Sequence, residues 1–183
     1  IHVSQSGGFG RTVITCEEQR VPALGYVMRY RDLAAAIDAR LADDAIIDNA
    51  VIDKLQIRRD GVLITLTRGV VSLNIHCRLL VHAEGTPTVE EDVSTFDYHQ
   101  HAVLAEVRPS PRHNHRAWER FSPDGPLALL PLGEDYSVVF TVPPQRADAL
   151  MAMDDTAFLA ALQRQFGTRL NFTAASPRAR FPL

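Results

Sequence analysis

Two short stretches have residue types and spacings that could do chemistry. Asp97, His99 and His101 alternate along one segment, so an extended backbone would place the three side chains on one face. Carboxylate and imidazole groups in this arrangement could bind a metal such as zinc. The same residues also suit the polar start of a strand over 102–107, and we expect that role with no metal. His113 and His115 are expected in a surface loop.

The second stretch is the glycine-rich segment 6–10, where three of four consecutive residues are glycine. Its spacing differs from Gly-x-Gly-x-x-Gly, and a β-prone run over 12–16 follows it instead of a helix. We therefore predict a tight turn and not a phosphate loop. No nucleophile–base pair or acid–base dyad is evident, which favours a protein whose chemistry belongs to a cofactor.

Composition excludes several classes of protein. The 183 residues are 46% hydrophobic and 22% charged, which is typical of one globular domain or of a compact piece of a larger protein. The formal net charge of -3 gives no reason to expect nucleic acid as a partner. No apolar stretch approaches the roughly 20 residues that span a bilayer. Cys16 and Cys77 are far apart in sequence and are expected as buried, reduced thiols.

Hydrophobic patterning predicts an α+β fold. One helix is expected over 31–41, with Leu33, Ala34, Ile37 and Leu41 on one face. A second begins at 154–156 and ends at Gly167; its buried stripe contains Phe158, Leu159, Leu162 and Phe166. Strands are expected over 1–4, 12–16, 51–58, 62–67, 70–83, 102–107 and 136–142, the last ending at Pro143-Pro144. Because the elements do not alternate as β-α-β units, we expect a mixed, curved sheet with helices on one face.

The segment 117–132 predicts a hairpin. Trp118 and Arg120 bracket an alternating strand, and the turn residues 122–126 follow it. The apolar run 127–130 is expected to be a strand buried on both faces, ended by Pro131.

The order of residue types in this hairpin resembles the ubiquinone-biosynthesis flavin hydroxylases. The likeness rests on Glu119-Arg120-Phe121 and on the run 125–132. Further blocks occur in the family's order at 1–4, 8–10, 23–27, 80–85, 97–98 and 166–170. The resemblance runs across nearly the whole chain, but it covers only the middle of such an enzyme.

The resemblance implies the substrate domain of the aromatic flavin hydroxylase fold with an incomplete FAD-binding domain. Residues 1–183 are expected as a single domain that is a fragment of a larger flavoprotein. Residues 1–85 would contribute to the boundary with the cofactor domain, and residues 86–183 would form mainly the substrate-domain sheet and helix.

The resemblance also implies an activity. The full-length protein would be an FAD-dependent, NAD(P)H-using monooxygenase that hydroxylates a prenylated phenolic ring in ubiquinone biosynthesis. Its partner would be a small-molecule prenylated phenol or quinone precursor. We expect a cytoplasmic protein, peripheral to the inner membrane or part of a biosynthetic complex. The isolated fragment is expected to be inactive and to bind neither cofactor.

Site residues follow from the same resemblance, and none is expected to be catalytic. The cofactor-binding candidates are Arg31, Glu84 and Gly85. The substrate-binding candidates are Phe9, Arg11, Arg120, Phe121, Leu129 and Pro131, with Leu127 and Leu130 adding apolar surface.

The chain departs from the family pattern around Glu84. This residue replaces an Asp, Thr88 replaces a Ser, and the acidic run 90–92 occupies the region of a basic residue. Three acidic groups near a pyrophosphate would repel it unless they pointed to solvent. Two alternatives therefore remain: a non-catalytic paralogue that binds an apolar quinone, a lipid or an assembly partner, and a plain scaffold domain.

Overall fold

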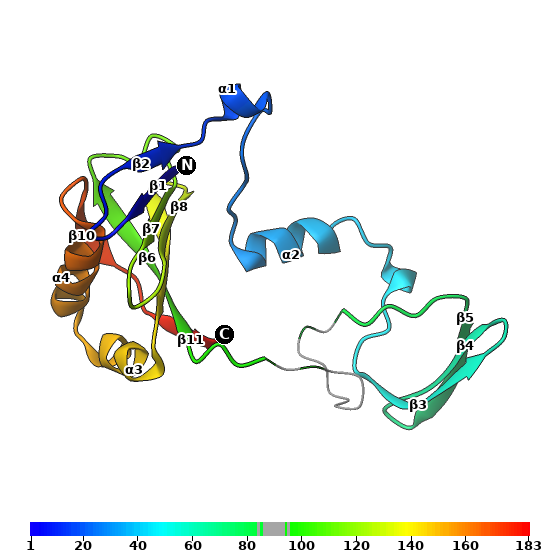
Figure 1. The fold of residues 1–183 in the computed structure, drawn as a ribbon. Helices are drawn as coiled ribbons and strands as arrows, with labels where there is room; N and C mark the ends of the chain where they lie inside the picture. The colour runs from blue at the N-terminus through cyan, green and yellow to red at the C-terminus, as the bar shows by residue number, and fades with distance from the viewer. Residues whose placement is uncertain (84, 86–93, 95) are drawn as a thin grey trace. The chain divides into compact units, whose positions relative to one another are not determined.

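The computed structural model describes residues 1–83, 85, 94 and 96–183, and the chain forms two compact units. The first contains Ile1–Arg29 and Phe96–Leu183, and the second contains Tyr30–Thr95. Each unit has its own sheet (Figure 1). The predicted α+β class is confirmed as a mixed sheet with few helices.

The first unit is built on an eight-stranded sheet with the order β10-β6-β9-β8-β7-β1-β2, and β11 also pairs with β6. β1 runs parallel to β7, while the pairs β7–β8, β8–β9 and β6–β9 are antiparallel. The strands are β1 His2–Gln5, β2 Arg11–Val13, β6 His101–Ser110, β7 Trp118–Phe121, β8 Leu127–Leu132, β9 Asp135–Val142, β10 Asn171–Ala175 and β11 Ala179–Pro182.

Two helices, α3 (Pro144–Ala152) and α4 (Asp155–Phe166), pack against one face of this sheet (Figure 1). α4 begins where the Asp154 side chain accepts a 2.7 Å hydrogen bond from the Ala157 N–H, and it ends at Gly167, as predicted. The core between helices and sheet contains Val103, Val107, Leu127, Leu129, Val138, Phe140, Leu150, Phe158, Leu162 and Phe166. These side chains hold the helices to the sheet by apolar burial.

The hairpin over 117–132 is confirmed as β7 and β8, but β8 is not buried on both faces. Its side chains alternate between buried and half-buried, because α3 and α4 cover one side of the sheet only.

Three other elements differ from the sequence expectation. α3 begins at the proline pair expected only to end a strand; Pro144 fits the first helical turn, where its missing N–H is no loss. β10 and β11 lie within 169–183, where no closing element is predicted, and both pair with β6. The strand expected over 12–16 ends at Val13, and the short helix α1 (Cys16–Gln19) follows with a capping box at Thr15.

The second unit contains α2 (Tyr30–Asp38), the 3₁₀ turn η1 (Asp43–Ala45), and the strands β3 (Ala50–Arg58), β4 (Gly61–Arg68) and β5 (Val71–Cys77). β5 ends at Cys77, so the strand predicted to extend to 83 is shorter than expected. The apolar stripe predicted for α2 is exposed: Leu33 is 42% and Ile37 50% accessible.

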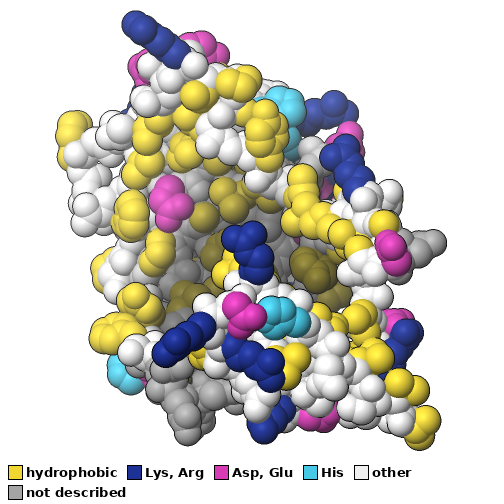
Figure 2. Space-filling model, turned by 90° about the vertical axis from the view of Figure 1, so that its right-hand side faces the viewer, with side chains coloured by type: hydrophobic (Ala, Val, Ile, Leu, Met, Phe, Trp, Pro, Cys, Tyr) yellow, Lys and Arg dark blue, Asp and Glu magenta, His cyan; other side chains and the backbone are white. Residues whose placement is uncertain are grey.

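Large hydrophobic side chains are frequent on the surface, and Figure 2 shows them among charged ones over much of the visible face. In the second unit they include Val51, Ile52, Ile57, Val70 and Val71. Cys16 and Cys77 are free thiols, as predicted, but are only partly buried. Of the described helices, none has the length and apolar character needed to cross a membrane.

Candidate functional site

The large sheet presents a second face, opposite α3 and α4. Leu129, Val138 and Val103 belong to the core that the helices cover. Because side chains alternate along a strand, the residues next to them in sequence face the other side of the sheet. The register then aligns one row across five neighbouring strands: Val3, Glu119, Ala128, Val139 and Leu104. All five are half-buried, and this largely apolar surface is called the open face below.

Glu119 is the one ionisable residue in that row. Its strand neighbours are Val3 and Ala128, and burial raises the pKa of its carboxyl. Within the described part of the chain, no cation lies at ion-pair distance from it. A carboxylate held among apolar side chains without a partner is a candidate functional group.

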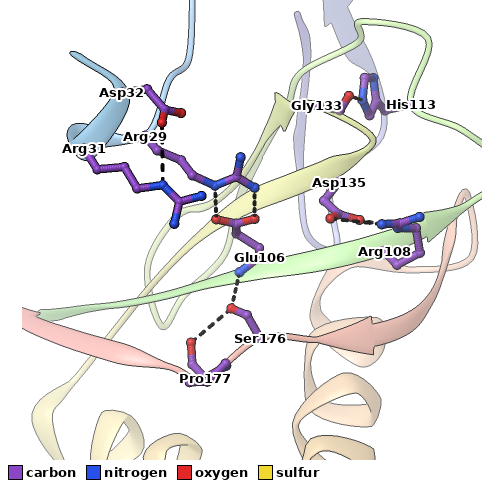
Figure 3. A network of polar contacts seen from close by, with 10 residues as sticks. All are labelled: Arg29, Arg31, Asp32, Glu106, Arg108, His113, Gly133, Asp135, Ser176 and Pro177. Atoms are coloured by element: carbon purple, nitrogen blue, oxygen red, sulfur yellow. Dashed lines mark hydrogen bonds and ion pairs between the residues drawn. The ribbon is translucent and has the colours of Figure 1, made fainter. Parts of the chain in front are cut away.

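The open face ends in a polar region on β6. Arg29 makes a bidentate contact to Glu106, with Nε–Oε1 and Nη2–Oε2 distances of 2.9 and 2.5 Å (Figure 3). The Glu106 N–H also donates to Ser176 Oγ at 2.9 Å. Arg108 pairs in a similar way with Asp135. A shallow depression of about 430 Å³ lies here, lined by Glu106, Arg108, Asp135 and residues 174–176. Its charged side chains are already paired, so the depression has little free charge to offer a ligand.

The predicted substrate-binding residues divide between the two faces. Phe121, at the end of β7, lies on the open face and is 49% exposed. Leu129 is fully buried in the core, and Pro131 lies on the same side of β8. Leu127 is buried with Leu129, whereas Leu130 belongs to the open face.

Arg120 also faces the helices. Its Nε donates a 2.9 Å hydrogen bond to the Gln165 carbonyl at the end of α4, and its Nη1 contacts Ser4 Oγ at 3.3 Å. A guanidinium at a helix C-terminus satisfies carbonyls that have no partner within the helix. These contacts tie α4 to β1 and β7.

The remaining predicted residues lie outside this face. Phe9 is fully exposed in the turn between β1 and β2, and Arg11 opens β2. Arg31 and Gly85 belong to the second unit. Arg31 lies in the first turn of α2 with its Nε 3.5 Å from Asp32, and Gly85 has φ +84°. Glu84, like Thr88 and residues 90–92, lies outside the described residues.

His99 and His113 each have a local partner. His99 Nδ1 lies 3.1 Å from Asp97, and among the residues with a described placement no group of three or more metal-ligating side chains is found. His113 is buried, contrary to the expected surface loop. Its ring donates to the Gly133 carbonyl at 2.9 Å (Figure 3) and accepts from the His115 N–H at 3.0 Å.

Comparison with known proteins gives the class to which the chain is similar. No family model matches it. Curated relatives are named as hydroxylases or monooxygenases of ubiquinone and its biosynthesis, which confirms the resemblance predicted from the sequence.

Three relatives illustrate this similarity. The chain is 36% identical over 104 residues to "Ubiquinone biosynthesis monooxygenase COQ6, mitochondrial" of Danio rerio, covering 53% of the chain and 22% of that protein. It is 32% identical over 158 residues to "Ubiquinone hydroxylase UbiL" of Rhodospirillum rubrum, covering 81% and 36%. It is 27% identical over 188 residues to "3-demethoxyubiquinol 3-hydroxylase" of Escherichia coli, covering 93% and 45%.

The chain thus spans less than half the length of each of these relatives. A solved structure, CmlS, a flavin-dependent halogenase, aligns with a TM-score of 0.46 at 18% identity, covering 73% of this chain and 27% of that one.

Proposed function

We propose that the complete protein is an FAD-dependent monooxygenase that uses NAD(P)H to hydroxylate the phenolic ring of a prenylated ubiquinone precursor. Support comes from relatives named as hydroxylases and monooxygenases and from the motif around Glu119-Arg120-Phe121. The observation that carries the proposal is the open face, where a half-buried apolar row surrounds one carboxylate.

In this proposal the open face forms one wall of the substrate site. Leu104, Leu130 and Phe121 offer apolar contact to a ring and its tail, which burial would stabilise by about 25 cal/mol per Å². Glu119 accepts a hydrogen bond from the phenol hydroxyl and orients the ring. By drawing on that proton, the carboxylate raises the electron density of the ring, which favours attack by an electrophilic oxygen.

The residues that would hold the flavin are Arg31 and Gly85. The Arg31 guanidinium is exposed, and its positive charge is complementary to the negative charge of a pyrophosphate. Gly85 has no side chain to block a close approach of the pyrophosphate to the backbone. Bound FAD would supply the redox chemistry: NAD(P)H would provide two electrons, and O₂ would provide one oxygen atom to the ring and the other to water.

A substitution at Glu119 tests this assignment. Glu119→Gln in the complete protein is expected to lower kcat/KM for the phenol by about 100-fold, because the amide is a much weaker acceptor for the phenol proton. The wild-type rate should fall as pH drops through the raised pKa of Glu119, since the protonated carboxyl cannot act as the acceptor. This acid limb should be missing in the variant.

The matched control is Glu134→Gln, which changes an exposed glutamate paired with Arg108 and Arg112 in the same unit. It should leave the rate and its pH profile unchanged. A Glu119→Gln enzyme with the wild-type rate and acid limb would remove Glu119 from the site.

The alternative, a non-catalytic paralogue that binds a quinone or lipid, has less support because the three relatives are all named for enzymatic reactions.

The tail of the proposed substrate partitions into lipid, so we place the enzyme in the cytoplasm at the periphery of the inner membrane. Recovery of the protein only in the soluble fraction of gently lysed cells would contradict this location.

A further inference from the structure

A corner of the first unit gathers three arginines from three separate segments: Arg11 from the start of β2, Arg116 from the loop before β7, and Arg169 from the loop after α4. The Arg116 and Arg169 guanidinium carbons lie 5.8 and 6.0 Å from the centre of the Trp118 ring. Arg11 is directly opposite Ser4 on β1, and therefore shares a face of the sheet with Ser4, His2 and Trp118.

These three cations lack negative partners. Throughout the described residues, none of the three guanidinium groups lies within ion-pair distance of a carboxylate. All three residues are exposed, so a ligand in solution can reach them. Four other arginines of this unit, Arg29, Arg108, Arg178 and Arg180, each pair with an acidic side chain, whereas Arg20, Arg146 and Arg164 are, like the three corner arginines, without a described ion pair. The corner therefore concentrates uncompensated positive charge.

His2 lies beneath the arginines and adds an independent observation. It is only 4% exposed, its ring centre is 4.5 Å from that of Trp118, and neither ring nitrogen has a hydrogen-bond partner. Burial, and then the charges of Arg169 and Arg11, lower its pKa. Buried polar groups normally have partners, so the ring N–H of His2 is a buried donor that lacks an acceptor.

We propose that the corner formed by Arg11, Arg116 and Arg169 over His2 and Trp118 binds a phosphate group. Guanidinium groups bind phosphate oxygens through paired, charge-assisted hydrogen bonds, and three of them offset the charge of a phosphate dianion or diester. The site lies on the helix-covered side of the sheet, so it is distinct from the open face and does not depend on the proposed hydroxylation.

Two sources present the same chemistry: free phosphate or a phosphorylated small molecule in solution, and the phosphodiester of a lipid headgroup. Calorimetric titration of the complete protein with inorganic phosphate at constant ionic strength tests the first. Flotation with phosphatidylcholine vesicles, with and without phosphatidylglycerol, tests the second.

The variants for both arms are Arg116→Gln and Arg169→Gln, with Arg164→Gln as the matched control on the exposed surface of α4. Each test variant should weaken binding by about 10-fold, the effect of losing one charge-assisted contact, and the control should not. Thermal unfolding should show all three variants folded, because the substituted side chains are exposed.

If the wild type binds inorganic phosphate and the test variants bind it more weakly, the ligand is a soluble phosphate. If the variants differ from the wild type only with anionic vesicles, the ligand is a lipid headgroup. The ring signal of His2, identified in NMR spectra by its absence in His2→Phe, gives a second readout. An anion bound over the ring should raise the pKa of His2, because it offsets the arginine charges that lower it. The proposal is overturned if neither probe binds, or if Arg116→Gln and Arg169→Gln both bind the two probes as the wild type does.

Discussion

Leu129→Ala is expected to lower the free energy of unfolding by about 2–5 kcal/mol. Leu129 is fully buried between β8 and the helices, packed with Trp118 and Val138 as its cross-strand neighbours. Truncation leaves a cavity that the surrounding sheet and helices cannot close. Urea unfolding of the wild type and the variant, followed by circular dichroism, measures the difference.

The next residue supplies the control. Leu130→Ala makes the same chemical change one position along β8, on the half-buried open face. Its cost in stability should be about 1 kcal/mol or less, because little buried packing is lost. Equal costs for the two variants would contradict the division of this sheet into a helix-covered face and an open face.

Gly125→Ala should destabilise the fold by about 2–6 kcal/mol, the sum of a strained backbone and a steric clash. Gly125 has φ +141°, and an added Cβ would lie 2.5 Å from the carbonyl oxygen of Thr141 on β9. The clash involves backbone, so a side-chain rotation cannot relieve it. Thermal unfolding is the measurement.

Gly133→Ala is the matched control in the next hairpin turn. Its φ of +63° is also unfavourable to alanine, but nothing lies within 4 Å of an added Cβ. It should therefore cost only the left-handed backbone penalty, about 1–2 kcal/mol. If Gly125→Ala lost no more stability than Gly133→Ala, this result would contradict the close packing of the β7–β8 turn against β9.

The sequence predicts elements well where local signals agree with tertiary packing. The β7–β8 hairpin has a dense turn at 122–126, and α4 has both an Asp154 cap and a Gly167 end. α3 is missed because Pro143-Pro144 favours an end as much as a start. β10 and β11 are missed because they are largely exposed and owe their conformation to pairing with β6, which a local pattern cannot indicate.

The candidate site shows a similar limit. Alternation places Trp118, Arg120 and Leu129 on one side of the hairpin and Glu119, Phe121 and Leu130 on the other. Only the position of α3 and α4 decides which side is covered. The resemblance therefore includes Glu119 in its motif without giving it a role, because the environment of Glu119 depends on strands that are distant in sequence.

The measurement that tests the account most directly is the visible absorption spectrum of the complete protein, purified without added cofactor. We predict a flavin spectrum that bleaches when NAD(P)H is added without oxygen and returns when oxygen is admitted. A folded, colourless protein that also fails to take up added FAD would contradict the proposed monooxygenase and favour a non-catalytic paralogue.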